Sequence, residues 1–182
     1  MNDVLHLRVD RIPTPIGELA IVADQDDCLR AVDWSDHDDR LHRLCERYYG
    51  PGRYTLAPFR NPAGLTDAMV AYFGGDLTAI DALPVATGGT EFQRMVWNEL
   101  RRIPCGASIS YSELARRIGR PAAIRAVGLA NGANPVGIVV PCHRVIGANG
   151  TLTGYGGGIE RKRWLLSHEA KAAATSQLHL SL

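Results

Sequence analysis

Hydrophobic and polar positions alternate near the start of the chain. Leu5, Leu7 and Val9 are separated by polar residues, as in a strand with one buried face. A turn pattern at 14–17 precedes a second apolar run at 19–22, and a third run covers 28–34. These patterns predict a three-stranded antiparallel sheet.

Two amphipathic helices are expected to pack on this sheet. Leu41, Leu44, Cys45 and Tyr48 recur at helical spacing and predict a helix over 36–49, in which Cys45 is a core residue. A second helix is expected to follow Asn61 as its cap and to end at the glycines 74–75. Residues 1–83 therefore form a predicted small α/β domain without evident chemistry.

A polar, glycine-containing stretch at 84–90 is the predicted linker to a second, mainly helical domain over 91–170. Thr90 and Gln93 have the spacing of a capping box and predict a helix over 91–102. Ser110 and Glu113 repeat that spacing before a helix that extends to 118. The turn 119–121 and a helix over 122–131 complete a helix-turn-helix pattern, which many helical hairpins share.

The remaining chain contains three further features. The apolar run 138–140 predicts a short buried strand that Pro141 ends. A last helix is expected over 160–168, with Lys162 exposed and Glu169 at its end. The glycine-rich loop 153–158 lacks the residues of a phosphate-binding loop. Residues 171–182 are predicted to be a mobile tail.

Composition narrows the class of protein. With 182 residues, of which 46% are hydrophobic, the chain can bury a core, and it has no apolar run long enough to cross a membrane. It shows no secretory leader, so we expect a cytoplasmic protein. Its four cysteines are widely spaced and form no Cys-x-x-Cys pair, which argues against a zinc site and a disulfide framework. We expect no metal and no cofactor.

Charge is distributed unevenly along the chain. Residues 1–90 contain eight arginines and fourteen acidic residues, whereas residues 91–169 contain eleven basic and five acidic residues. This asymmetry favours an anionic partner for the second half, with nucleic acid as the commonest one. An ordinary solvated surface would also account for it.

Cys142 is the residue most suggestive of chemistry. It follows Pro141 and precedes His143 and Arg144, with Asn134 a short way upstream. Neighbouring cations and hydrogen-bond donors favour the thiolate, which is the nucleophilic form of cysteine. The alternative is a buried, inert cysteine, which is the usual fate of a free thiol.

The segments around Cys142 resemble a known signature. Pro141-Cys142-His143-Arg144-Val145, with residues 130–135 before it and the glycine-rich residues 154–158 after it, is similar to the alkyl-acceptor motif of O6-alkylguanine-DNA alkyltransferases, also called methylated-DNA–protein-cysteine methyltransferases. The resemblance covers about 90–169 and is weaker over the first 85 residues. It implies an RNase H-like α/β domain followed by a winged-helix-like domain with a helix-turn-helix.

The resemblance implies a single-turnover DNA repair reaction. Double-stranded DNA carrying O6-alkylguanine is bound and the damaged base is flipped out of the stack. The sulfur of Cys142 then displaces guanine from the alkyl carbon and keeps the alkyl group. O4-alkylthymine is a further candidate substrate. We expect a monomer in solution. The sequence leaves open whether molecules bind DNA cooperatively and which sizes of alkyl group are accepted.

The same resemblance implies roles for residues near Cys142. His143 takes the thiol proton, directly or through water, and Glu169 orients His143, as in a catalytic triad. Asn134 braces the turn around the cysteine. Tyr111 donates toward the flipped base and crowds a phosphate. In this setting the pKa of Cys142 is expected to be depressed.

Other matched positions imply substrate and DNA contacts. Backbone groups of Cys142 and Val145 are expected to read the base edge, and Tyr155 to line the pocket. Gly156 and Asn131 stand where some relatives have a serine and a larger apolar residue. For DNA, Arg125 fills the gap that the flipped base leaves in the stack, and the small residues of its helix permit minor-groove entry. These small residues are Ala123, Ala126 and Gly128.

Two other functions fit some of these residues. A non-catalytic module that recognises alkylated bases would need the helix-turn-helix but would not need Cys142. A cysteine hydrolase could use Cys142 and His143, although such enzymes usually bring the histidine from a distant segment. Repeated turnover of an ester would distinguish the hydrolase from a protein that is alkylated once.

Overall fold

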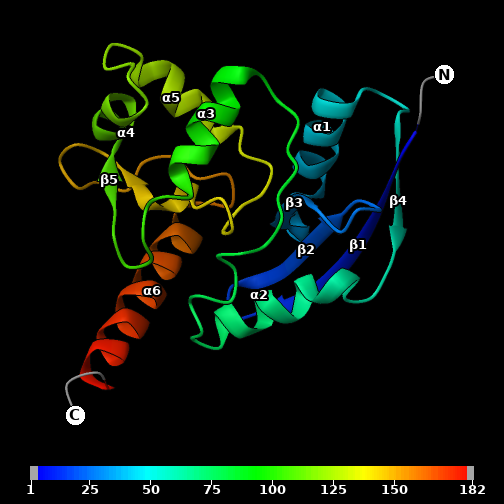
Figure 1. The fold of residues 1–182 in the computed structure, drawn as a ribbon, viewed down its shortest axis with the longest axis horizontal. Helices are drawn as coiled ribbons and strands as arrows, with labels where there is room; N and C mark the ends of the chain where they lie inside the picture. Colours follow the sequence, from blue (N-terminus) through cyan, green and yellow to red (C-terminus); the bar gives the residue numbers. More distant parts are fainter. Residues whose placement is uncertain (1–3, 180–182) are drawn as a thin grey trace.

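The computed structural model describes residues 4–179, with side chains up to residue 174. Its first half contains a four-stranded sheet in the order β3-β2-β1-β4 (Figure 1). The strands are β1 (Leu5–Thr14), β2 (Gly17–Ala23), β3 (Leu29–Trp34) and β4 (Tyr54–Pro58). The three antiparallel strands β1, β2 and β3 are those that the hydrophobic pattern predicts.

Strand β4 corrects the predicted three-stranded sheet. It pairs parallel with β1, with Leu5 opposite Tyr54 and Val9 opposite Pro58. The strand is short and largely exposed, so it carries little hydrophobic signal. Proline at its end is tolerated because β4 is an edge strand.

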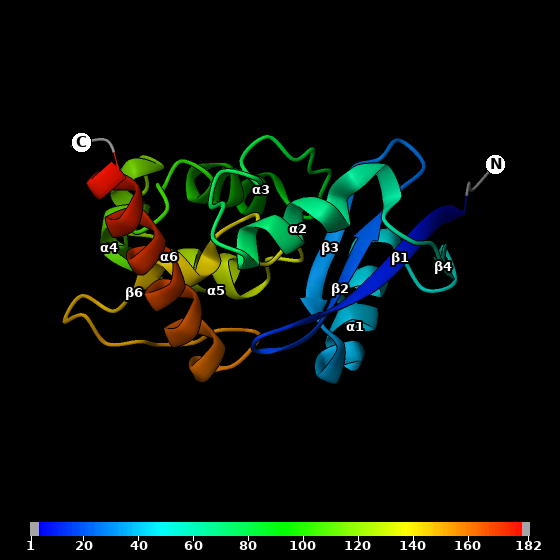
Figure 2. The same cartoon turned by 90° about the horizontal axis from the view of Figure 1, so that it is seen from below.

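The two faces of the sheet are covered by different elements (Figure 2). Helix α1 (Asp38–Tyr49) packs Leu41 and Cys45 against Leu7 and Val22 on one face. The other face packs against α2 (Leu65–Phe73) and against the second half of the chain. Asn61 precedes a 3₁₀ turn, Pro62–Gly64, that lies before α2, and its Oδ1 accepts from the Asp67 amide in the first turn of α2 at 3.2 Å.

The second half is mainly helical. It comprises α3 (Glu91–Leu100), α4 (Tyr111–Arg117), α5 (Ile124–Gly132), α6 (Ile159–His179) and the short parallel pair β5 (Ile109–Ser110) and β6 (Val145–Ile146). Thr90 and Gln93 form the predicted capping box of α3. Ser110 accepts the Glu113 amide at the start of α4, whereas the Glu113 carboxylate pairs with Arg116 and Arg117.

One continuous core joins the two halves. It includes Leu19, Ile21 and Met69 from the first half and Val96 and Leu100 from the second. The predicted linker lies along β3, since the Leu29 amide donates to the Pro84 carbonyl oxygen at 2.8 Å and the Leu29 carbonyl accepts from Ala86. The sheet is therefore held against the helices that surround Cys142.

Two predictions for the second half are wrong. Residues 138–140 are buried, but they form a turn in which Ile138 has a φ of 70° and the Val140 amide donates to Val136. Hydrophobicity alone cannot distinguish a buried turn from a buried strand. Helix α6 does not end at Glu169; it continues to His179, and residues 180–182 of the predicted tail lie outside the described residues.

Candidate active site

Cys142 begins a short 3₁₀ helix, Cys142–Arg144, directly after Pro141. The residue is 7% exposed. Asn134 holds the turn in front of it: the Asn134 side-chain amide donates to the Val140 carbonyl oxygen at 2.8 Å, and its oxygen accepts from the Val136 amide at 3.0 Å. The Asn134 side chain thus ties together the two ends of the turn that precedes Cys142.

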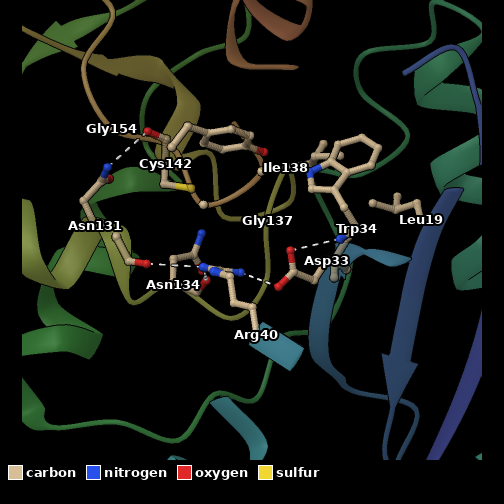
Figure 3. A pocket seen from close by; sticks show the side chains of 15 residues that line it. Leu19, Asp33, Trp34, Arg40, Asn131, Asn134, Gly137, Ile138, Cys142 and Gly154 are labelled. Carbon is tan, nitrogen blue, oxygen red and sulfur yellow. Dashed lines mark hydrogen bonds and ion pairs between the residues drawn. The ribbon is translucent and has the colours of Figure 1, made fainter. Parts of the chain in front are cut away.

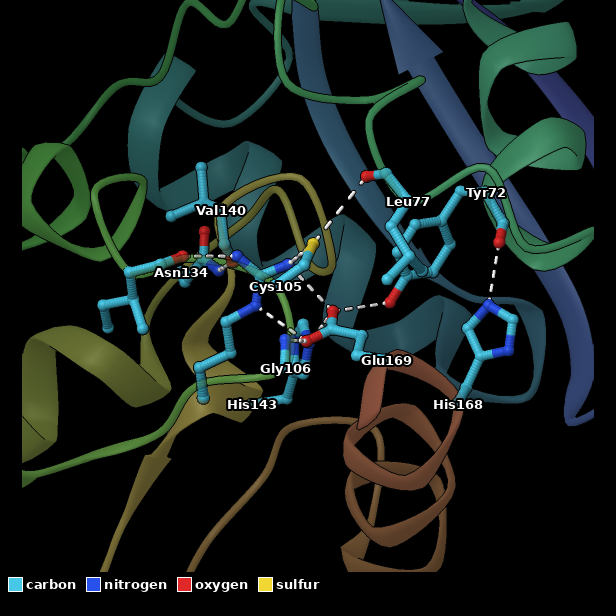
Figure 4. A network of polar contacts seen from close by, with 11 residues as sticks. Tyr72, Leu77, Cys105, Gly106, Asn134, Val140, His143, His168 and Glu169 are labelled. Carbon is cyan, nitrogen blue, oxygen red and sulfur yellow. Dashed lines mark hydrogen bonds and ion pairs between the residues drawn. The ribbon is translucent and has the colours of Figure 1, made fainter. Parts of the chain in front are cut away.

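His143, the residue after Cys142, forms a buried pair with Glu169 (Figure 4). Nε2 of His143 lies 2.8 Å from Oε1 of Glu169, and both side chains are completely buried. The other ring nitrogen, Nδ1, is buried and has no hydrogen-bond partner among the described residues. Because Nε2 contacts the carboxylate, Nδ1 is the nitrogen that is free to accept a proton.

Glu169 is also bound by Arg144 and Tyr72, neither of which was predicted to contact it. Arg144 donates through Nε to Oε2 at 2.9 Å and through Nη2 to Oε1 at 2.8 Å. Tyr72, from α2, donates its hydroxyl to Oε1 at 2.8 Å. Burial alone would raise the pKa of Glu169, but the hydrogen bonds and charges of His143 and Arg144 outweigh burial and hold this pKa below its ordinary value.

The thiol of Cys142 is more basic than predicted. Burial raises its pKa, and this outweighs the opposing effects of the Asn134 hydrogen bond and of the Arg40 and Lys162 charges. Burial also lowers the pKa of His143 despite the hydrogen bond to Glu169, so the imidazole is neutral. Near neutral pH, these two shifts favour a protonated thiol beside a neutral imidazole.

A small cavity lies beside Cys142 between the two halves of the chain (Figure 3). Asp33, Trp34 and Arg40 line it from the first half, and Asn131, Asn134 and the residues 154–157 line it from the second. Its volume of about 20 Å³ is room for about one water molecule. A purine would enter only if the wall moved.

Tyr111 and Tyr155 stand close to this cavity. The Tyr111 hydroxyl donates to the Thr153 carbonyl oxygen at 3.4 Å, and the nearby Cys142 contributes, after burial, to raising its pKa. The Tyr155 ring meets the His143 ring edge to face, with centroids 6.5 Å apart. The structure thus brings both predicted tyrosines to the cysteine.

The carbonyl groups expected to read the base already have partners. The Cys142 oxygen accepts from the Asn131 side chain at 3.3 Å, and the Val145 oxygen accepts from Lys162 Nζ at 2.6 Å. The Cys142 oxygen also accepts from the Val145 amide, so it could accept from a base only by exchanging one of these two donors. The Val145 oxygen can accept a second hydrogen bond. Lys162 is fully buried, so the prediction that it is exposed was wrong. Its burial is possible because Nζ also donates to the Thr153 and Gly154 carbonyl oxygens of the glycine-rich loop.

Helix α5 presents Arg125 to solvent, and no ion pair is formed by this residue within the described part of the chain. Ala126 is exposed beside it, whereas Ala123 and Gly128 are half-buried. A Cβ atom at Gly128 would lie 3.9 Å from the Tyr111 ring, so α5 packs closely on the start of α4. Arg125 and Tyr111 are thereby placed on adjacent helices.

Several contributors escaped prediction from sequence. Tyr72, Asp33 and Arg40 belong to the half in which no chemistry was expected, and their positions depend on how the two halves pack. Lys162 offered a weak signal, since it is one of only two lysines in a chain rich in arginine.

The described residues offer neither a metal-binding cluster nor a helix suited to crossing a membrane. Residues 4–174, whose side chains the structure describes, contain no group of three or more His, Cys, Asp or Glu that could hold a metal ion. Among the helices of the same residues, none combines the length and apolar composition that crossing a membrane requires.

Comparison with known proteins places this site in a family. The profile described as "6-O-methylguanine DNA methyltransferase, DNA binding domain" matches residues 91–171. A methylated-DNA–protein-cysteine methyltransferase of Shigella flexneri is 52% identical over 166 residues, which are 91% of this chain and 97% of the relative. That of Salmonella typhimurium is 54% identical over the same length and the same shares.

Solved structures agree with the sequence relatives. The crystal structure of Mycobacterium tuberculosis OGT in complex with DNA matches with a TM-score of 0.74 and 43% identity, covering 92% of this chain and 94% of that one. The O6-methylguanine-DNA methyltransferase of Pyrococcus kodakaraensis matches with a TM-score of 0.66 and 25% identity, covering 90% and 98%.

These matches define a DNA-binding alkyl-transfer protein built on a mixed α/β fold. The chain belongs to the methylated-DNA–protein-cysteine methyltransferase family.

Proposed function

We propose that this protein repairs DNA by moving the alkyl group of O6-alkylguanine to Sγ of Cys142, once per molecule. Membership of the family supports the reaction. The observation that carries the assignment to this residue is the geometry around it: a cysteine at a cavity, followed directly by a buried histidine that is paired with Glu169. O4-alkylthymine is proposed as a second substrate.

The chemistry is a displacement at the alkyl carbon. A bond forms between Sγ of Cys142 and this carbon as the bond from the carbon to O6 breaks, and the electron pair leaves with guanine. The thiol proton passes to Nδ1 of His143, directly or through one water, and Glu169 stabilises the imidazolium that results. The guanine anion is then protonated, and the thioether on Cys142 remains because water does not cleave it.

The proton transfer is needed because the resting thiol is protonated. Burial raises the pKa of Cys142 and lowers that of His143, so neither group is charged before the substrate binds. Burial of both groups also slows the reaction of the thiol with other electrophiles. Glu169 makes His143 a better proton acceptor once the reaction begins, since its charge stabilises the imidazolium in a site from which water is excluded.

Helix α5 is proposed to enter the minor groove. Its exposed Arg125 would fill the place of the flipped base, and the small side chains of Ala123, Ala126 and Gly128 would allow a close approach. Phosphate contacts and groove width carry little sequence information, which suits a protein that must find damage in any sequence. The relative crystallised with DNA supports DNA as the partner.

The flipped base is proposed to lie between Tyr111 and Tyr155. Tyr111 would donate a hydrogen bond to the leaving guanine, while the carbonyl oxygens of Cys142 and Val145 would accept from its edge. Asn131 and Gly156 would set the width of the pocket. Because the cavity holds about one water molecule, part of its wall would have to shift to admit a purine.

We further propose an RNase H-like first domain, residues 1–83, joined by the linker 84–90 to a winged-helix-like second domain, residues 91–170. The protein would act as a monomer in the cytoplasm, where thiols stay reduced; all four of its cysteines are free. Whether molecules cluster on DNA is tested by the cooperativity of binding to long duplexes.

The test is a single-turnover reaction with duplex DNA that contains one O6-methylguanine. Intact-mass and peptide analysis should find one added methyl group on Cys142. Cys142→Ala should take up none, whereas Cys105→Ala, which removes another partly buried thiol, should still react. A folded wild-type protein that gains no methyl group would reject the proposal.

A further inference from the structure

Arg40 reaches the candidate active site from the first half of the chain. It lies on α1, and its side chain, 19% exposed, lines the cavity beside Cys142 (Figure 3). Its Nη2 donates to the carbonyl oxygens of Gly132 and Asn134 at 3.2 and 3.1 Å. Its Nη1 pairs with the buried carboxylate of Asp33. The guanidinium therefore bridges β3 and the turn that follows α5.

The guanidinium also occupies the space next to Gly156. A Cβ atom at this position would lie 2.7 Å from both Cζ and Nη2 of Arg40. No side chain could be added there unless Arg40 moved. The wall of the cavity at position 156 is thus made by a residue more than a hundred positions earlier in the chain.

Hydrogen bonds to the described residues use only some of the N–H groups of Arg40. A guanidinium carries five N–H groups, and the three contacts with Asp33, Gly132 and Asn134 use three of them. Asp33 is 3% exposed, so its carboxylate fixes the guanidinium from behind. A cation that is held in place, has unused donors and lies in a site with little water is well suited to stabilise a negative charge that develops during a reaction.

We propose that Arg40 contacts the flipped alkylguanine and stabilises the negative charge on its O6 as the alkyl group leaves, in the place of a side chain at position 156. This inference rests on the proposed function. Arg40 transfers no proton: the electron pair of the broken bond stays on guanine, and the guanidinium interacts with it through charge and hydrogen bonds.

Transfer rates test the proposal. Arg40→Ala should slow methyl transfer from the duplex, and benzyl transfer from free O6-benzylguanine, by about tenfold to a hundredfold. Arg40→Lys should recover part of the rate. Arg43→Ala, which removes an exposed arginine one turn further along α1, should react like the wild type. Equal rates for Arg40→Ala and the wild type on both substrates would overturn the proposal.

A reagent without guanine separates substrate contact from an effect on the thiol. Iodoacetamide alkylates cysteine and releases iodide, so it does not need a guanine-binding cation. Arg40→Ala should slow benzyl transfer at least tenfold more than it slows alkylation of Cys142 by iodoacetamide. A fall by the same factor in both reactions would show that Arg40 acts on the cysteine or on its surroundings, and would overturn the proposal.

The close approach to Gly156 provides a second, independent test. In the wild type, Gly156→Ser should slow transfer because serine displaces Arg40. In the Arg40→Ala background the same change should speed it up, because the hydroxyl then has room and can donate in place of the guanidinium. Additive effects of the two changes would count against the proposal.

A charge-matched variant serves as the control for effects of Arg40→Ala on folding. Arg40→Ala leaves the buried Asp33 unpaired, so Asp33→Asn/Arg40→Gln, which removes both charges, is measured alongside with thermal unfolding of each protein. A folded double variant with slow transfer supports the proposal, and one with the wild-type rate refutes it. If the wild type itself accepts no alkyl group, the proposed function fails instead.

Discussion

Nε2 of His143 and Oε1 of Glu169 lie 2.8 Å apart, and neither side chain is exposed to solvent. The contact fixes which ring nitrogen of His143 is available, because the second nitrogen, Nδ1, has no partner among the described residues. Arg144 and Tyr72 hold the carboxylate from two other directions. The histidine beside Cys142 is thus oriented by a network that spans both halves of the chain.

Removing the charge of Glu169 should damage both stability and transfer. Glu169→Gln leaves the Arg144 guanidinium buried without an anion, so we expect the free energy of unfolding to fall by about 3–5 kcal/mol. Methyl transfer from the duplex should slow at least tenfold. Urea unfolding and rapid-quench kinetics measure these effects. The control is Glu160→Gln, on the exposed side of the same helix, which should change neither the free energy of unfolding nor the transfer rate by a measurable amount.

The buried histidine should make the protein less stable in mild acid. Burial lowers the pKa of His143, so below about pH 6.5 the unfolded chain takes up a proton that the folded protein does not. Stability therefore falls as the pH drops from about 6.5 toward the folded pKa, by up to about 1.4 kcal/mol per pH unit. A second loss follows below about pH 4.3, because the pKa of Glu169 is lowered by folding.

Urea unfolding from pH 8 to pH 4 measures this profile. His143→Gln cannot titrate and should remove the first loss while it keeps the second. His6→Gln changes an exposed histidine and should leave the whole profile intact. An unaltered first loss in His143→Gln would assign it to another group.

Tyr72→Phe should weaken the contact between α2 and the His143–Glu169 pair. The variant removes a buried hydrogen bond to a charged acceptor, which is worth about 1.5–3 kcal/mol. We expect a loss of stability of this size and a several-fold slower transfer, because Glu169 gains freedom to turn. Tyr48→Phe removes a hydroxyl that donates to the Ala133 carbonyl oxygen at 2.7 Å. Tyr48→Phe should lower stability without slowing transfer. Equal transfer rates for Tyr48→Phe and Tyr72→Phe would therefore argue against a role of Tyr72 in orienting Glu169.

Arg125→Ala should affect duplex substrates selectively. The side chain is exposed and forms no ion pair within the described residues, so stability should change by less than about 0.5 kcal/mol. Transfer from O6-methylguanine in a duplex should fall at least tenfold, whereas transfer from free O6-benzylguanine should hardly change. Arg60→Ala, another exposed arginine, serves as the control. Similar losses on both substrates would contradict a role in base flipping.

Local features of this protein were readable from its sequence. The capping residues Thr90 and Ser110 mark helix starts correctly, because a cap is formed by atoms within one turn of the chain. Cys142 and His143 are adjacent in sequence, so their proximity needs no fold. For residues 138–140 the sequence correctly predicted burial, but it predicted a strand where the backbone forms a turn.

The sequence by itself thus indicated the family, marked Cys142 and its neighbours as the candidate site and predicted two consecutive helices before them. Only the tertiary structure decided which distant groups complete the site. Glu169 meets Tyr72 across 97 positions, and Arg40 meets Asn134 across 94. It also decided that the Cys142 thiol is protonated at rest, because burial depends on how the two halves close around it. Contacts and desolvation of this kind arise from packing between remote segments, which no local pattern of residues encodes.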